Sequence, residues 1–122
     1  MTICEKSMKF AVRIVKLYKY LCDEKREYVM SKQVLRSGTS IGANAAEAKQ
    51  SQSKREFVAK MSISLSEASE TDFWLELLYQ TEYLKTKEYE SMIFDCREIE
   101  KMLTAIVKTS RQNIENSDGL GK

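Results

Sequence analysis

Residues 89–106 read YESMIFDCREIEKMLTAI, and apolar side chains recur in this stretch at alternating steps of three and four residues. The recurring positions are Tyr89, Met92, Cys96, Ile99, Leu103 and Ile106. A helix with this spacing presents one apolar stripe to a partner helix, as in a coiled coil. The stretch therefore predicts a long amphipathic helix that is stabilised mainly by packing against other helices.

Three further segments with helical periodicity precede this stretch, separated by short polar breaks. We expect them at residues 4–22, 31–50 and 54–84. Ser31 and Thr86 are predicted N-caps of the second and fourth helices, and Ser53 followed by Glu56 fits a capping box at the third. Because such short breaks make neighbouring helices antiparallel, the sequence predicts an all-α, antiparallel up-down four-helix bundle.

Composition supports a single helical domain. The 122 residues include no proline and only four glycines, and 43% are hydrophobic and 31% charged. A small β-sandwich would need more turn residues, whereas a chain of this length can bury a helical core without disulfides. We expect the bundle to occupy residues 1–114 and residues 115–122, which lose the periodicity, to be disordered.

Several kinds of chemistry are missing from the sequence. It has no histidine, the commonest general base and metal ligand, and Cys4, Cys22 and Cys96 lack zinc-binding spacing. The segment 38–42 lacks the lysine and the preceding strand of a phosphate loop. We therefore expect no enzyme activity, no metal, no cofactor and no small-molecule substrate.

The same features bear on location. An odd number of cysteines without a signal peptide favours a reducing, cytoplasmic compartment. No apolar run reaches the ~18 residues that a membrane-spanning helix needs, so no membrane partner is expected.

The second predicted helix carries a motif of small and polar residues. Gly38 and Gly42 lie one turn apart, which favours close approach of another helix because glycine otherwise costs ~1 kcal/mol within a helix. A polar stripe accompanies them, formed by Arg36, Ser40, Asn44 and Glu47. The third helix offers carboxylates at Glu67, Glu70 and Asp72. The stripe is either a solvated face or an Arg36–carboxylate network between the two helices.

Apolar residues exceed what one buried arc per helix requires. In the first helix Met8, Val12 and Val15 fall outside the main stripe of Phe10, Ile14, Leu17 and Leu21. In the third helix the run from 73 to 79 is apolar on more than one face. We identify a candidate subunit interface there, formed by Phe73, Trp74, Leu77 and Leu78.

Charge is distributed unevenly. Residues 1–30 hold seven Lys and Arg against four Asp and Glu, a net of +3, whereas residues 54–83 hold three against six, a net of −3. One face of the first helix carries Lys6, Lys9, Arg13 and Lys16. This face is a candidate nucleic-acid-binding surface, and the alternative is a basic face that is simply solvated.

Three segments of the sequence resemble those of a known protein family. The stretch LRSGTSIGAN at residues 35–44 closely resembles the signature of bacterial four-helix-bundle proteins related to the 23S rRNA intervening-sequence proteins. The stretches FAVRIVKL at 10–17 and EASET at 67–71, followed by WLELL at 74–78, resemble one branch of that family. Ala45 departs from the pattern, because relatives often carry a larger aliphatic residue there.

The resemblance implies that the bundle assembles into a ring-like homo-oligomer, with a pentamer as the expected size, and that it has no catalytic residues. It also implies similarity to the accessory variability protein of diversity-generating retroelements, in which a basic barrel binds nucleic acid. Our leading hypothesis is thus a non-catalytic oligomeric bundle that binds RNA or DNA through basic helix faces. The alternative is a protein–protein interaction scaffold without nucleic-acid binding.

Overall fold

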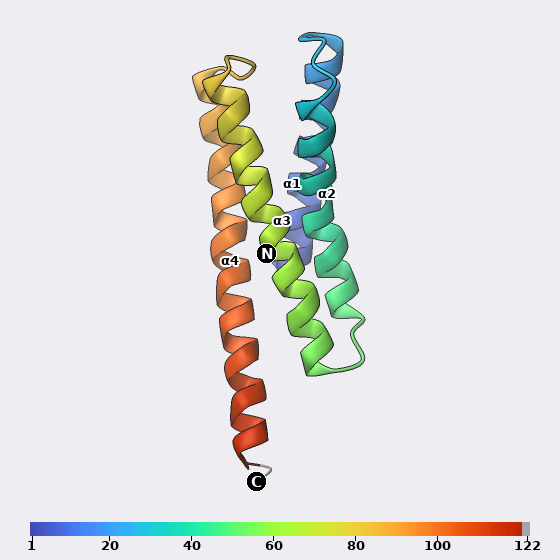
Figure 1. Ribbon diagram of the computed structural model, residues 1–122, viewed down its shortest axis with the longest axis vertical. Helices are drawn as coiled ribbons and strands as arrows, with labels where there is room; N and C mark the ends of the chain where they lie inside the picture. Colours follow the sequence, from blue (N-terminus) through green and yellow to red (C-terminus); the bar gives the residue numbers. More distant parts are fainter. Residues whose placement is uncertain (121–122) are drawn as a thin grey trace.

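Four α-helices account for most of the chain in a computed structural model, which describes the backbone of residues 1–120 and the side chains of residues 1–117 (Figure 1). They are α1 (Ile3–Asp23), α2 (Met30–Lys49), α3 (Lys54–Gln80) and α4 (Thr86–Leu120). The described residues contain no strand. The predicted all-α class and four-helix arrangement are confirmed.

The helices form two antiparallel hairpins, α1–α2 and α3–α4, which pack together along α2 and α3 (Figure 1). The contact between α1 and α4 is the smallest of the four helix pairings. Because α1 packs on α2 and α4 but not on α3, α1 and α3 occupy diagonal positions in the bundle.

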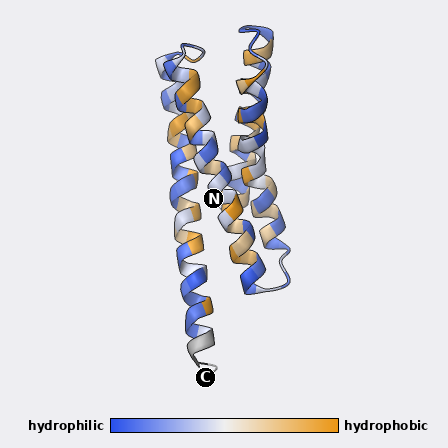
Figure 2. Ribbon diagram, in the orientation of Figure 1, coloured by the Kyte–Doolittle hydropathy of each residue, from blue (hydrophilic) through white to orange (hydrophobic). Residues whose placement is uncertain are grey.

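The core follows the predicted stripes. Figure 2 shows hydrophobic residues interspersed with hydrophilic ones along every helix. Met92, Cys96, Ile99 and Leu103 of the α4 stripe are buried, and Tyr89 and Ile106 are partly buried against them. The α1 stripe is buried at all four of its positions, which are Phe10, Ile14, Leu17 and Leu21.

Two helices begin with side-chain caps. Thr2 accepts a hydrogen bond from the Glu5 amide, and Ser53 accepts one from the Glu56 amide, each at 3.1 Å. The Glu56 carboxylate accepts in turn from the Gln52 amide at 3.1 Å. The predicted cap at Ser53 is therefore confirmed, with the reciprocal bond displaced by one residue.

Ser31 is not the cap of α2. Val29 occupies the N-cap position without a side-chain bond, and Ser31 lies buried in the first helical turn. The free amides of Val29 and Ser31 are satisfied by the Glu27 carboxylate, at 3.1 and 2.8 Å. A carboxylate at a helix N-terminus also interacts favourably with the helix dipole, so the turn residue replaces the expected hydroxyl.

The turn between α3 and α4 also differs from the prediction. α3 ends at Gln80, four residues before the expected end at Leu84, and Glu82 adopts a φ of 69°. The Lys85 carbonyl accepts from the Tyr89 amide at 2.9 Å, and the Lys85 amide donates to the Glu88 carboxylate at 3.0 Å. Lys85 thus holds the cap position that we had predicted for Thr86.

The end of the chain is the largest correction. Residues 115–120, expected to be disordered, continue α4 as far as Leu120, and residues 121–122 lie outside the described residues. The lower part of α4 runs beside the start of α3, where Lys54 Nζ lies 3.4 Å from Ser117 Oγ and Arg111 lies 3.4 Å from Ser62 Oγ. Each residue added to an existing helix gains a backbone hydrogen bond at little entropic cost, so α4 continues without an apolar stripe.

Candidate functional site

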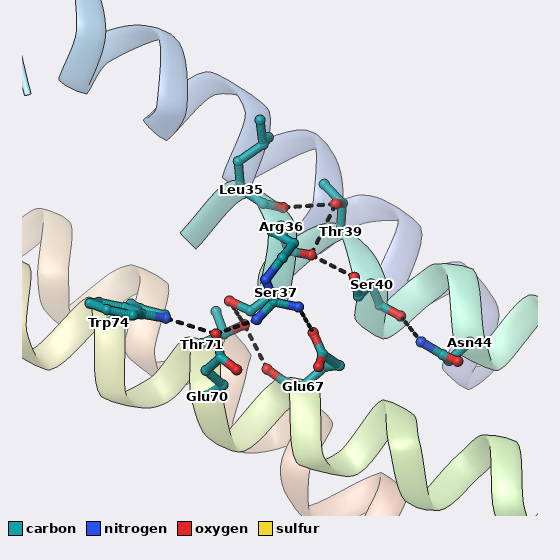
Figure 3. Close-up of polar contacts among 10 residues, drawn as sticks. All are labelled: Leu35, Arg36, Ser37, Thr39, Ser40, Asn44, Glu67, Glu70, Thr71 and Trp74. Carbon is teal, nitrogen blue, oxygen red and sulfur yellow. Dashed lines mark hydrogen bonds and ion pairs between the residues drawn. The ribbon is translucent and has the colours of Figure 1, made fainter. Parts of the chain in front are cut away.

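Arg36 links α2 to α3 on the surface of the bundle (Figure 3). Its guanidinium donates to Glu67 at 2.9 Å and also contacts the Glu70 carboxylate. Glu70 accepts a further bond from Trp74 Nε1 at 3.0 Å. Hydrogen bonds from Trp74 and then Arg36 lower the pKa of Glu70. The polar stripe therefore includes an Arg36–carboxylate network, which is half exposed to solvent because half of the Arg36 side chain is accessible.

The other polar residues of the motif bond mainly to their own helix (Figure 3). Ser40 Oγ donates to the Arg36 carbonyl at 2.6 Å, and Asn44 Nδ2 donates to the Ser40 carbonyl at 2.9 Å. Glu47 reaches Lys60 of α3 at 3.5 Å. Of these contacts only the Glu47–Lys60 pair joins α2 to α3, and none of them converges on a reactive group.

Gly38 and Gly42 lie where α2 meets α1. A Cβ added to Gly38 would lie 2.7–2.8 Å from three side-chain atoms of Ile14, and one added to Gly42 would lie 3.3 Å from Ser7 Oγ. The predicted close helix approach is therefore present at both glycines and is tighter at Gly38. A side chain at Gly38 requires one of the two helices, or Ile14, to move.

Buried hydroxyls hold the opposite side of α2. Thr71 Oγ1 donates to Ser37 Oγ at 2.9 Å, and Ser64 Oγ donates to the Ile41 carbonyl at 2.7 Å. All three hydroxyl-bearing residues are completely buried. The motif therefore packs α2 against two helices. Its glycines contact α1, and the Ser37 hydroxyl contacts α3.

Two of the four cations on the predicted basic face of α1 form ion pairs with α4, and the other two are exposed. Lys6 pairs with Glu98 at 3.1 Å, and Arg13 pairs with Asp95 at 2.6 Å. Arg13 also donates to Ser91 Oγ at 2.8 Å. These two cations therefore join α1 to α4.

Lys9 and Lys16 of the same face are exposed, and neither forms an ion pair with the side chains that the structure describes. Lys16 borders a groove of about 380 Å³ between α1 and α4, whose lining includes Leu17, Leu84 and Glu88. Only half of the predicted nucleic-acid-binding set is thus free to meet phosphates.

The residues of the candidate subunit interface on α3 differ in their exposure to solvent. Phe73 is 57% exposed and lies edge-on to Trp74, with ring centroids 5.2 Å apart. Trp74 and Leu77 are half-buried. Leu78 is fully buried in the core, so its assignment to an interface was wrong. It follows Leu75 by three residues and therefore shares the inward face of α3.

A basic segment of α4 escaped the sequence predictions. Residues 101–114 contain Lys101, Lys108 and Arg111 and no acidic residue. Lys101 and Lys108 line a shallow groove of about 570 Å³, whose lining also includes Arg97 and the acidic residues Asp72 and Glu100. A count of charge along α4 would have found this segment, whereas the predictions compared only residues 1–30 and 54–83.

Asp72, Cys96 and Glu100 form a small acidic cluster between α3 and α4. Their oxygen and sulfur atoms lie within 4.8 Å of one another. Burial, followed by the hydrogen bond with Asp72, raises the pKa of Glu100 to about 7, and burial raises the pKa of the Cys96 thiol. Arg97 pairs with Asp72 at 3.1 Å. The neutral thiol and the neighbouring guanidinium both disfavour a cation, so the cluster is better described as a shared-proton contact.

No helix within residues 1–120 is both long enough and apolar enough to cross a membrane. The fold and these surfaces together define the chain as an all-α four-helix bundle whose polar motif holds helices together.

Comparisons with known proteins agree with this class. The model of the 23S rRNA-intervening sequence protein family matches residues 1–105. A crystal structure from Bacteroides thetaiotaomicron, of a protein with unknown function from the S23 ribosomal protein family, matches with a TM-score of 0.87 and 56% identity. The match covers 88% of this chain and 99% of that one. No curated protein matches the chain. The chain belongs to the 23S rRNA-intervening sequence protein family.

Proposed function

We propose that this protein is a non-catalytic four-helix bundle that associates with copies of itself to form an oligomeric scaffold. The observation that carries the proposal is a set of large apolar side chains that are exposed on α1 and α3. Met8, Val12, Ile63 and Phe73 are 65%, 48%, 45% and 57% exposed, although each lies within a helix. Exposed apolar side chains gathered on helix faces are typical of interaction surfaces.

A non-catalytic role fits the chemistry of the described surface. Arg36, Glu67 and Glu70 are engaged with one another, and Asp72 and Glu100 share a contact beside Arg97. The groups that could exchange protons therefore contribute to helix pairing. The sequence contains no histidine to supply an alternative base.

The expected assembly is a closed ring, with five copies as the size implied by the family resemblance. Its test is the molar mass in solution, measured by light scattering during size-exclusion chromatography. A mass several times 14.1 kDa supports the proposal, and a mass of 14.1 kDa at micromolar concentration overturns it. The cytoplasmic location stays a prediction, and three free cysteines suit a reducing compartment.

Binding of RNA or DNA is the second candidate function. It is favoured by Lys101, Lys108 and Arg111, which are exposed on α4 within a segment that has no acidic residue. A ring would repeat this basic segment around an axis, and repeated weak contacts with one polyanion gain from high effective concentration. A titration of labelled RNA and DNA with the intact oligomer at low salt tests this role. If no binding is detected, the nucleic-acid role is excluded and the scaffold function is the one that remains.

A further inference from the structure

α1 carries a second stripe of uncharged side chains outside the bundle core. The stripe, which we call the α1 seam, alternates steps of four and three residues along the whole helix. Its members are Cys4, Met8, Ala11, Val15, Tyr18 and Cys22. Met8 is exposed and the other five are half-buried. This is the spacing of a coiled-coil seam, and its partner helix is absent from the single chain.

α3 carries a matching stripe on its outer side. The α3 seam has the same alternating steps and the same number of positions, which are Ala59, Ile63, Ser66, Glu70, Phe73 and Leu77. Glu70 is the one charged member, and its carboxylate is already bound by Arg36 and Trp74. Ile63 and Phe73 are the most exposed apolar residues of α3.

The two seams lie at the same height along the bundle. Ser7 of α1 faces Gly42 of α2, and the adjacent Ile41 carbonyl accepts the hydrogen bond of Ser64 on α3. Ser7 and Ser64 are therefore level across the bundle. Their sequence neighbours, which belong to the two seams, are level as well.

A second set of contacts fixes the same relationship two turns further along. Ile14 of α1 faces Gly38 of α2, and the adjacent Ser37 accepts the hydrogen bond of Thr71 on α3. Ile14 and Thr71 have the same separation in sequence as Ser7 and Ser64. The seams follow this register to within two residues, or ~3 Å at 1.5 Å of rise per residue. In an up-down bundle α1 and α3 also point in the same direction.

We propose that the α1 seam of one copy packs against the α3 seam of the next copy around a closed ring. This inference rests on the proposed self-association and names the surfaces that produce it. Copies in a cyclic ring are related by rotation without rise, so touching surfaces must be level when the bundles stand along the ring axis. Two different surfaces that meet in this way form a heterologous contact, which generates a ring when the rotation between copies closes.

Four of the six layers pair side chains of similar size, and in the other two Val15 meets Glu70 and Cys22 meets Leu77. In the shared register Met8 meets Ile63 and Tyr18 meets Phe73, so the larger side chains meet one another. Cys4 meets Ala59, so small side chains also coincide.

Charge agrees with this pairing. Lys16 and Lys19 flank the α1 seam and Glu76 flanks the α3 seam, and all three are exposed. Residues 1–30 carry a net +3 and residues 54–83 a net −3, so unlike surfaces attract whereas like surfaces repel.

Complementary variants test the contact. Met8→Glu destroys only the α1 seam, and Ile63→Glu destroys only the α3 seam. Each variant alone should fall to the mass of one subunit, with an unchanged helical circular-dichroism signal. An equal mixture should form a complex of two subunits and no larger, because one intact seam of each kind remains. Phe94→Glu, a control at an exposed aromatic residue of α4, should keep the mass of the unaltered protein.

The outcomes separate this inference from the proposed function. If both seam variants keep the full mass, the seams are not the interface, although self-association stands. If the mixture stays at one subunit, or if either variant alone forms a dimer, the heterologous pairing is wrong. If the unaltered protein is a monomer, the proposed function itself fails.

Cross-linking gives a test that does not depend on disrupting the assembly. Ala59→Cys places a thiol opposite Cys4 of the neighbouring copy, and mild oxidation should join the copies into a ladder on a denaturing gel. The highest band counts the copies in the ring. Ala105→Cys, at an exposed position of α4 outside both seams, should give no ladder. A ladder from Ala105→Cys but not from Ala59→Cys would overturn the pairing.

Discussion

Gly38 of α2 lies so close to Ile14 of α1 that a Cβ at the glycine would be 2.7 Å from Ile14 Cγ1. Both residues are buried, so neither side can yield into solvent. The absence of a side chain at residue 38 thus sets the distance between the two helices. The same contact fixes the height of α1 relative to α2, and through Ser37 and Thr71 relative to α3.

Gly38→Ala should therefore destabilise the protein, although alanine is the better helix former by ~1 kcal/mol. Overpacking costs ~1–3 kcal/mol, and three contacts below 3 Å place Gly38→Ala at the upper end of that range. After the gain in helix propensity, we expect a net loss of about 1–2 kcal/mol in the free energy of unfolding. Chemical denaturation followed by circular dichroism measures it. Gly42→Ala is the matched control, since its new Cβ would lie 3.3 Å from Ser7 Oγ and 3.5 Å or more from the other Ser7 atoms. A Gly38→Ala protein as stable as the unaltered one would refute the packing explanation.

Arg36→Met tests the surface network between α2 and α3. The methionine keeps much of the arginine stem but loses both ion pairs, and half-exposed pairs of this kind contribute only ~0–1 kcal/mol. The expected loss is therefore below about 1 kcal/mol and should shrink at high salt. Unfolding can be followed by the fluorescence of Trp74, the only tryptophan in the sequence. A loss of several kcal/mol would show that the network is structurally essential.

Glu100 should make stability depend on pH. Its pKa is raised to about 7 from a normal value of 4.5, mainly by burial, so the folded state holds the proton at higher pH than the unfolded chain. Stability should consequently fall as pH rises from about 4.5 through 7. Glu100→Gln should remove this part of the fall. The variant should therefore lose less stability between pH 5 and pH 8 than the unaltered protein does. Glu90→Gln, on an exposed turn of the same helix, should retain the fall, and identical pH profiles for both variants would contradict the assignment.

Nucleic-acid binding, if it occurs, should depend on α4 more than on α1. Changing Lys101, Lys108 and Arg111 together to glutamine should weaken binding and flatten its salt dependence, by roughly 0.9 per lost phosphate contact on duplex DNA. Changing Lys9 and Lys16 to glutamine is the matched comparison on α1. Titrations of labelled RNA and DNA at two salt concentrations measure both slopes. A larger effect from the α1 variant would restore the face that the sequence first indicated.

The helices and their core could be predicted because a period of three and four residues reports directly which face is buried. The same pattern failed at Leu78, where the run from Phe73 to Tyr79 is apolar on several faces and does not reveal which arc points inward. The cap of α2 was missed because the Glu27 carboxylate, four residues upstream, reaches the amides that Ser31 was expected to serve.

The basic face of α1 shows a different limit. Lys6 and Arg13 do share a helix face, as predicted, but their partners Glu98 and Asp95 lie on the last helix. A single sequence reports the spacing within a helix and not the pairing between distant ones. The match between the two seams was missed for the same reason, because their shared height depends on contacts through α2.

The molar mass of the intact protein in solution tests the account most directly. Light scattering coupled to size-exclusion chromatography, repeated over a dilution series at micromolar concentrations, should give a constant whole-number multiple of 14.1 kDa, with five copies as the expected value. A closed ring should show no larger species as concentration rises, because every seam is already paired. A mass of 14.1 kDa throughout, or a mass that grows without limit, would contradict a closed ring built from the seams of α1 and α3.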